Sequence, residues 1–197
     1  MNRYTCRWAA GLVLALAALV LPSVRADDEE EMKLTREAGV DVAKLVDAMK
    51  DKMDGDKKDA EAIVKKHGLD YVMYQFKPRE RGGLGLGVKG TIKPDGIELK
   101  IKDLTENKIS AADLKKQGPA LIRAAQVASV LSDMASVTTP PKAKPGTPAS
   151  AWATYSADMK KGAKEFAEAV KGGKPDVVQK AALNLNASCT GCHSAYR

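Results

Sequence analysis

The residues best suited to chemistry lie at the end of the 197-residue chain, where Cys189, Cys192 and His193 form the pattern Cys-x-x-Cys-His. Two thiols separated by two residues can add to the two vinyl groups on one edge of a haem, and the adjoining imidazole can then bind the iron. We therefore expect one covalently attached haem c, with Cys189 and Cys192 as anchors and His193 as the proximal axial ligand.

Three other kinds of site use the same residue types. A thioredoxin-like redox pair needs its cysteines at the start of a helix within alternating strands and helices. A zinc site needs four ligands, and His67 is the residue that could complete the set. A structural disulfide between cysteines so close in sequence would close a small loop and stabilise the fold little. These alternatives stay open beside haem attachment.

The motif continues the pattern of a helix that we predict from Pro175 nearly to the end of the chain. Proline suits the first position of a helix, and Gly172 and Gly173 separate this helix from the preceding one. Apolar or small side chains then recur at steps of three and four, which places them on one helical face. That face comprises Val178, Ala181, Ala182, Leu185, Cys189, Cys192, His193 and Tyr196. We therefore expect the haem site on the inward side of a helical bundle.

The rest of the chain predicts a mainly α fold, an antiparallel four-helix-type bundle with an extra N-terminal helix. Helical periodicity covers residues 33–53, 57–66, 69–76, 110–137 and 150–171. Ser110 and Asp113 are typical of a helix start, and the alanine-rich stretch 120–134 indicates packing on several sides. Residues 138–149 form a Pro/Lys-rich loop.

The segment 82–104 has a different character, and we expect a Gly-rich loop followed by a small inserted β-hairpin. Ile97, Leu99 and Ile101 alternate with charged residues, as in a half-buried strand. The residues before them, 93–96, read Lys-Pro-Asp-Gly, which is a strong turn signal.

Residues 1–26 have the features of a secretory signal peptide: basic residues, a short apolar run and a small-residue cleavage box. We expect export to the periplasm without a permanent membrane span, because the apolar run is too short to cross a bilayer. The leader holds three arginines and no acidic residue, so its removal lowers the formal net charge from +7 to +4. This small excess and the few aromatic residues argue against a nucleic-acid partner. Residues 27–197 are then expected to form a single haem-binding helical domain.

The nine C-terminal residues, Cys-Thr-Gly-Cys-His-Ser-Ala-Tyr-Arg, resemble the ending of class II c-type cytochromes, the family of cytochrome c-prime and its low-spin relatives. The helix before them, with Trp152, Tyr155, Met159, Phe166 and Val170 on one face, is similar to the third helix of that family, and 120–134 to the second. The resemblance covers roughly residues 110–197. It implies one haem in a helical bundle, a redox partner protein and, in many members, a homodimer.

The resemblance also implies two cases for the other face of the iron. A methionine there gives a low-spin iron suited to electron transfer, whereas an apolar side chain leaves a site for NO or CO. Met73 is our first candidate for the distal ligand because aromatic residues surround it, and Arg79 or Arg81 could meet a propionate. Met49, Met53 and His67 are further candidates for the distal ligand.

The expected function is thus non-enzymatic electron transfer. One alternative is a gas-binding haem protein, and an alternative of another class is a haem-free helical binding protein.

Overall fold

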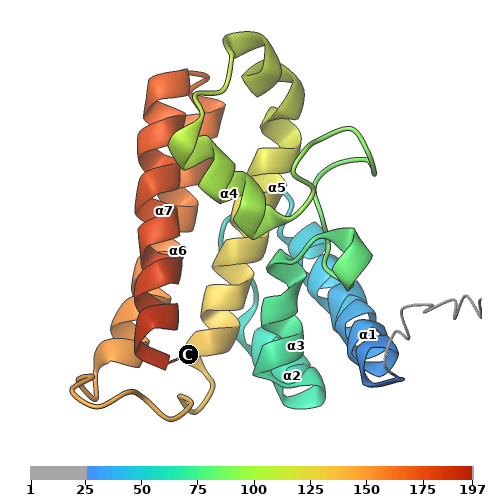
Figure 1. The fold of residues 1–197 in the computed structure, drawn as a ribbon, viewed down its shortest axis with the longest axis vertical. Coiled ribbons are helices and arrows are strands. Elements are labelled where there is room, and N and C mark those ends of the chain that lie inside the picture. Colours follow the sequence, from blue (N-terminus) through green and yellow to red (C-terminus); the bar gives the residue numbers. More distant parts are fainter. Residues whose placement is uncertain (1–25, 197) are drawn as a thin grey trace, which may run out of the picture.

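The computed structural model describes residues 26–196, and the first 25 residues of the predicted leader lie outside that range. The described chain is mainly helical and contains no β-strand (Figure 1). Its α-helices are α1 (Ala26–Met49), α2 (Lys57–His67), α3 (Leu69–Met73), α4 (Ile97–Glu106), α5 (Ala111–Ser136), α6 (Ala151–Lys171) and α7 (Pro175–Tyr196). Two 3₁₀ turns, η1 (Tyr74–Phe76) and η2 (Arg79–Arg81), follow α3. The predicted helical bundle is confirmed.

The centre of the bundle is α5, which packs against α6 and against the N-terminal helices. The side-chain hydroxyl of Ser110 caps this helix by accepting a hydrogen bond from the backbone N–H of Asp113 at 3.0 Å. Every residue from Ala124 to Ala135 is buried, as the alanine-rich sequence predicted. α6 packs in turn against α7, so that the three longest C-terminal helices form one antiparallel stack.

The predicted β-hairpin is wrong, because its supposed strand is helix α4. Ile97, Ile101 and Leu104 are at most 4 % exposed, whereas Leu99 is 46 % exposed. The buried positions are separated by four and three residues, which is the helical repeat, and α4 packs on α7. An alternation over only six residues cannot outweigh this packing.

The Gly-rich segment 82–96 is a closely packed loop without strands. The backbone N–H of Gly83 donates a hydrogen bond to the carbonyl oxygen of Pro78 at 3.2 Å. Arg79 bridges this loop, since its guanidinium donates to Asp95 and to the carbonyl oxygens of Leu86 and Gly87. The loop therefore holds the segment after η1 in a fixed position against α1.

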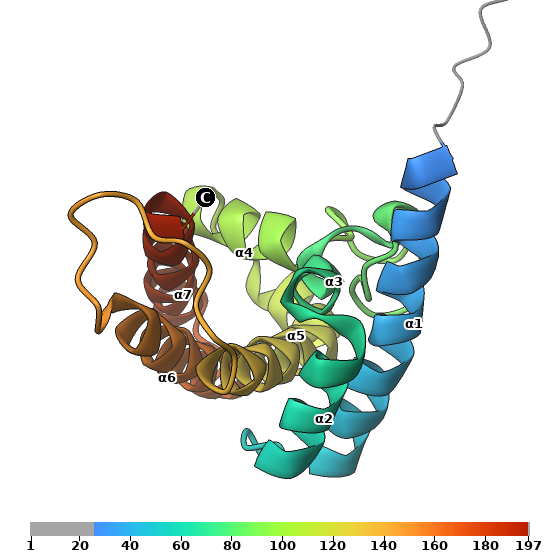
Figure 2. The ribbon, with the colours of Figure 1, turned by 90° about the horizontal axis from the view of Figure 1, so that it is seen from below.

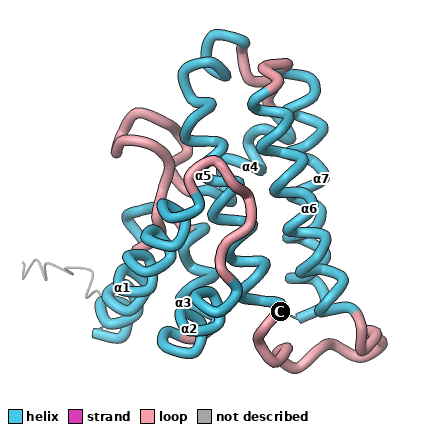
Figure 3. Tube along the Cα trace, turned by 180° about the vertical axis from the view of Figure 1, so that it is seen from behind, coloured by secondary structure: helices cyan, strands magenta, loops and turns pink. Residues whose placement is uncertain are grey.

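Helices α1, α2 and α3 form a layer against α5 (Figure 2). In the same view α3, α4, α7, α6 and α5 follow one another in a ring. The loop of residues 137–150 lies beside the C-terminal end of α7 (Figure 3), where the Lys144 N–H donates to the Ala195 carbonyl at 2.9 Å. None of the described helices is long and apolar enough to cross a membrane.

Candidate functional site

A pocket at the end of the bundle brings together segments that are far apart in the chain. Its walls come from α3 and η1, from α4, from α6 and from α7, with Ala135 of α5 at its base. The cavity has a volume of about 90 Å³ and opens to solvent at its mouth. The lining residues are Met73, Tyr74, Phe76, Lys77, Glu98, Ile101, Ala135, Trp152, Tyr155, Ser156, Met159, Asn186, Ser188, Cys189, Cys192 and His193.

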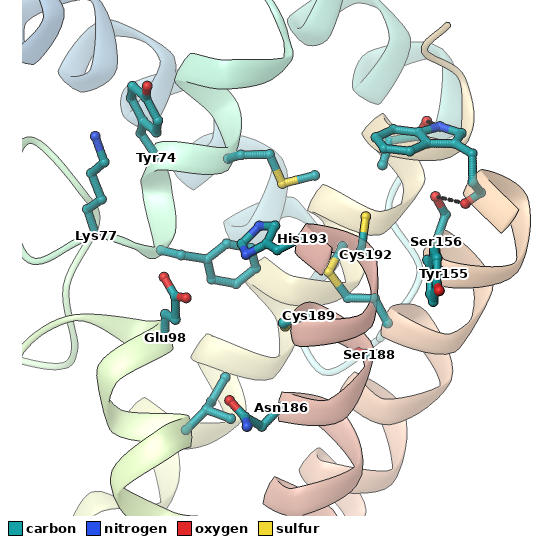
Figure 4. Close-up of a pocket in the computed structure, with 16 residues that line it drawn as sticks. Tyr74, Lys77, Glu98, Tyr155, Ser156, Asn186, Ser188, Cys189, Cys192 and His193 are labelled. Carbon is teal, nitrogen blue, oxygen red and sulfur yellow. Dashed lines mark hydrogen bonds between the residues drawn. The ribbon is translucent and has the colours of Figure 1, made fainter. Parts of the chain in front are cut away.

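All three motif residues line this pocket. The buried stripe of α7 runs through Leu185 and Ser188 to the half-buried Cys189 and Cys192. His193 is more exposed than the stripe predicted, because it lies on the last turn of α7, at the mouth. Figure 4 shows its imidazole directed toward the wall that carries Tyr74, Lys77 and Glu98, while Tyr155 and Ser156 stand on the opposite side.

Both cysteines in the described chain are free thiols. Burial, and after it the nearby negative charge of Glu98, raise the pKa of Cys189 to about 11. The Cys189 side chain is therefore a protonated thiol at neutral pH. A redox-active cysteine needs the opposite shift, toward the thiolate, so this environment argues against a thioredoxin-like pair.

The zinc alternative lacks its fourth ligand at this site. His67 lies on α2, where its Nε2 is 2.9 Å from a carboxylate oxygen of Asp41, and it does not line the pocket. Among residues 26–196 no group of three or more histidine, cysteine or acidic side chains could hold a metal ion. The thiols and the imidazole thus stand side by side without converging on one point.

Met73 lines the same pocket as the motif, together with Phe76 and Tyr74 from η1. The other distal candidates do not: Met49 is buried in the core, and Met53 packs against that core. Met159 of α6, which sequence reasoning did not consider as a ligand, also lines the pocket and is 8 % exposed. The sequence does place Met159 on the apolar face of the helix expected over residues 150–171, and this position could have indicated it as a pocket residue.

The proposed propionate partners, Arg79 and Arg81, lie outside the pocket. Arg79 is held by Asp95 and by the Gly-rich loop. Among residues 26–196, the one lysine or arginine that lines the pocket is Lys77. Its Nζ lies 3.2 Å from the centre of the Tyr74 ring and 3.0 Å from Glu31. Sequence reasoning missed Lys77, although it directly precedes the proline that ends this helical segment.

Aromatic contacts fix the end of α7 beside the pocket. Tyr196 packs edge-on against Trp152 of α6 at a centroid distance of 5.0 Å, as its predicted packing against a neighbouring helix required. The indole N–H of Trp152 donates to the Ala135 carbonyl at 2.9 Å. Gly191 lets α7 approach α6, since a Cβ at this position would lie 2.9 Å from the Tyr155 ring.

The donor set fits a covalently held haem better than it fits a bare metal ion. Two thiols lie on one wall with an imidazole beside them, and the opposite wall offers a methionine and a cation. Small-molecule pockets commonly have volumes of roughly 300–1,000 Å³. At about 90 Å³ the cavity is smaller than these pockets, so a macrocycle would require the side chains at its open mouth to move apart.

Comparison of the chain with protein-family models, with curated proteins and with solved structures gives no match.

Proposed function

We propose that this chain is a periplasmic mono-haem c-type cytochrome that transfers electrons. The observation that carries the proposal is the shared pocket: Cys189, Cys192 and His193 line one wall, and Met73 lines another. These four residues are the ones that the sequence suggested on separate grounds. A chance arrangement of two thiols would not require a methionine and aromatic side chains across the cleft.

Each residue would have a distinct role in holding the group. Cys189 and Cys192 would anchor it through thioether bonds, His193 would be the proximal ligand and Met73 the distal one. The haem supplies one-electron chemistry, and the axial ligands and the polarity of the pocket set its potential. The chain contributes fixed positions and the partial exclusion of water by Ile101, Phe76 and Met159.

Gas binding is the second candidate, and the shape of the pocket favours it. The cavity, about 90 Å³ in volume, would suffice for a diatomic molecule and has mostly apolar walls. If Met73 does not ligate the iron, this space would receive NO or CO at an open coordination position. A haem-free helical binding protein is the remaining alternative.

Absorption spectra of the exported protein separate these functions. The full chain is expressed with a working c-type maturation system, and spectra are recorded oxidised, reduced, and reduced under CO. Electron transfer predicts a low-spin spectrum that CO leaves unchanged. A high-spin spectrum shifted by CO would favour gas binding, and the lack of any haem band would leave the haem-free function.

The matched variants are Cys189→Ser and Ser194→Ala. Cys189→Ser should remove one thioether and shift the reduced spectrum, because one vinyl group stays unsaturated. Ser194 is exposed and lies next to the motif without lining the pocket, so its replacement should leave the spectrum unchanged.

A further inference from the structure

The acidic side chain of Glu98 is exposed at the pocket that the motif lines. It lies in the first turn of α4, the helix that replaces the expected hairpin, and it lines the cleft with Cys189. Among residues 26–196 no lysine or arginine forms an ion pair with it. Lys77, the cation on the same wall, pairs with Glu31 and lies over the Tyr74 ring.

The negative charge of Glu98 acts electrostatically on Cys189 of the motif. Glu98 is the largest electrostatic cause, after burial, of the raised pKa of the Cys189 thiol. Unlike charges attract, and because Glu98 is exposed, solvent screens part of this attraction. An oxidised haem iron carries one positive charge more than a reduced one, so a carboxylate near the ring favours the oxidised state.

We propose that Glu98 is a tuning residue that lowers the reduction potential of the haem bound at Cys189, Cys192 and His193. This inference rests on the proposed function and deepens it. It assigns a role to α4, which joins the pocket through Glu98 and Ile101. Glu98 would act through its charge alone, without contact with a reacting atom.

Two charge-neutralising variants on the same helix provide the test, Glu98→Gln and Glu106→Gln. Glu106 is also exposed and also lies on α4, but it does not line the pocket. Glu98→Asp keeps the charge and its favourable position at the start of the helix. Circular dichroism and thermal unfolding verify that all three variants fold.

The first measurement uses the haem-free protein carrying Cys192→Ser, in which the alkylation rate of Cys189 is followed against pH. Glu98→Gln should lower the pKa of the Cys189 thiol, while burial keeps it above the ordinary value of 9.0. Glu106→Gln should not change it. An unchanged Cys189 pKa in Glu98→Gln would overturn the inference whether or not the protein binds haem.

The second measurement is a redox titration of the holoprotein. At a fixed ambient potential, Glu98→Gln should raise the ratio of reduced to oxidised haem by about three- to tenfold, Glu106→Gln should not, and Glu98→Asp should restore most of the native value. A shifted thiol pKa with an unshifted potential would also overturn the inference. If the native protein binds no haem while the thiol still responds, the proposed function fails, and the tuning role fails with it.

Discussion

At the scale of single residues, the site depends on cysteine, methionine and histidine side chains that line one pocket. Met73 and the Cys-x-x-Cys-His motif are brought together by two helices that belong to opposite ends of the chain. The sequence predicted the motif residues from their spacing. It suggested Met73 from its aromatic surroundings, and only the packing of α3 against the bundle relates the two.

Met73→Leu tests the distal ligand. Leucine keeps the volume and removes the sulfur, so the low-spin spectrum of the holoprotein should change to a high-spin one that binds CO. Met159→Leu is the matched control, because Met159 lines the same pocket from α6. An unchanged spectrum in Met73→Leu, or a loss of the low-spin state in Met159→Leu, would remove Met73 as the ligand.

At the scale of elements, a partly buried pair joins α1 and α2 in the N-terminal layer. The Asp41 carboxylate accepts hydrogen bonds from His67 and Lys66, which hold the pKa of Asp41 well below its ordinary value. The His67 side chain is only 7 % exposed, although the two residues before it are lysines. The residues next to His67 in the sequence do not show that its acidic partner, Asp41, lies on another helix.

Asp41→Asn should lower the free energy of unfolding by about 1 kcal/mol at neutral pH. A carboxylate with a depressed folded-state pKa stabilises the fold above its unfolded-state pKa, and this stabilisation is lost as the pH falls below about 4. Denaturant unfolding at pH 7 and near pH 3 measures the difference. Asp47→Asn on the same helix, whose pair with Arg123 is more exposed, should cost less, and a difference for Asp41→Asn that grows toward low pH would contradict the assignment.

The close packing of the Gly-rich loop leads to a second prediction at this scale. A Cβ on Gly83 would lie 1.8 Å from the carbonyl oxygen of Lys77, so Gly83→Ala should destabilise the fold by about 2 kcal/mol and displace Lys77 from the pocket. Thermal unfolding provides the measurement. Gly118→Ala in α5 is the control, since its Cβ would meet nothing closer than 3.7 Å and alanine favours the helix.

A Gly83→Ala variant as stable as the native chain would show that the loop is loosely held. The sequence predicted a flexible loop here because glycine has no preferred backbone angle. The sequence does not indicate that the backbone at Gly83 packs so closely against the backbone at Lys77.

At the scale of the whole molecule, the long helices could be predicted, because each has a sustained 3.6-residue repeat and a recognisable start or end. Ser110, Pro175 and Gly68 are examples, and the structure places all three at helix boundaries. Helix α4 was missed because its first six residues alternate between apolar and charged side chains, as a strand would. Its contact with α7, which decides between strand and helix, is a tertiary interaction.

The dependence on tertiary contacts also explains why only part of the site could be predicted. Spacing within one helix predicted Cys189, Cys192 and His193, whereas Lys77 and Glu98 come from segments whose mutual position depends on the Gly-rich loop and on α4. Charged residues that line a pocket from different elements can be identified only when the arrangement of those elements is known.

The most direct test of the central claim is the intact mass of the exported protein under denaturing conditions. We expect the mature chain to retain the mass of one haem, and the double variant Cys189→Ala/Cys192→Ala to lose it while it remains folded. A native chain that carries no haem after maturation, with both thiols free to react with an alkylating reagent, would contradict the account.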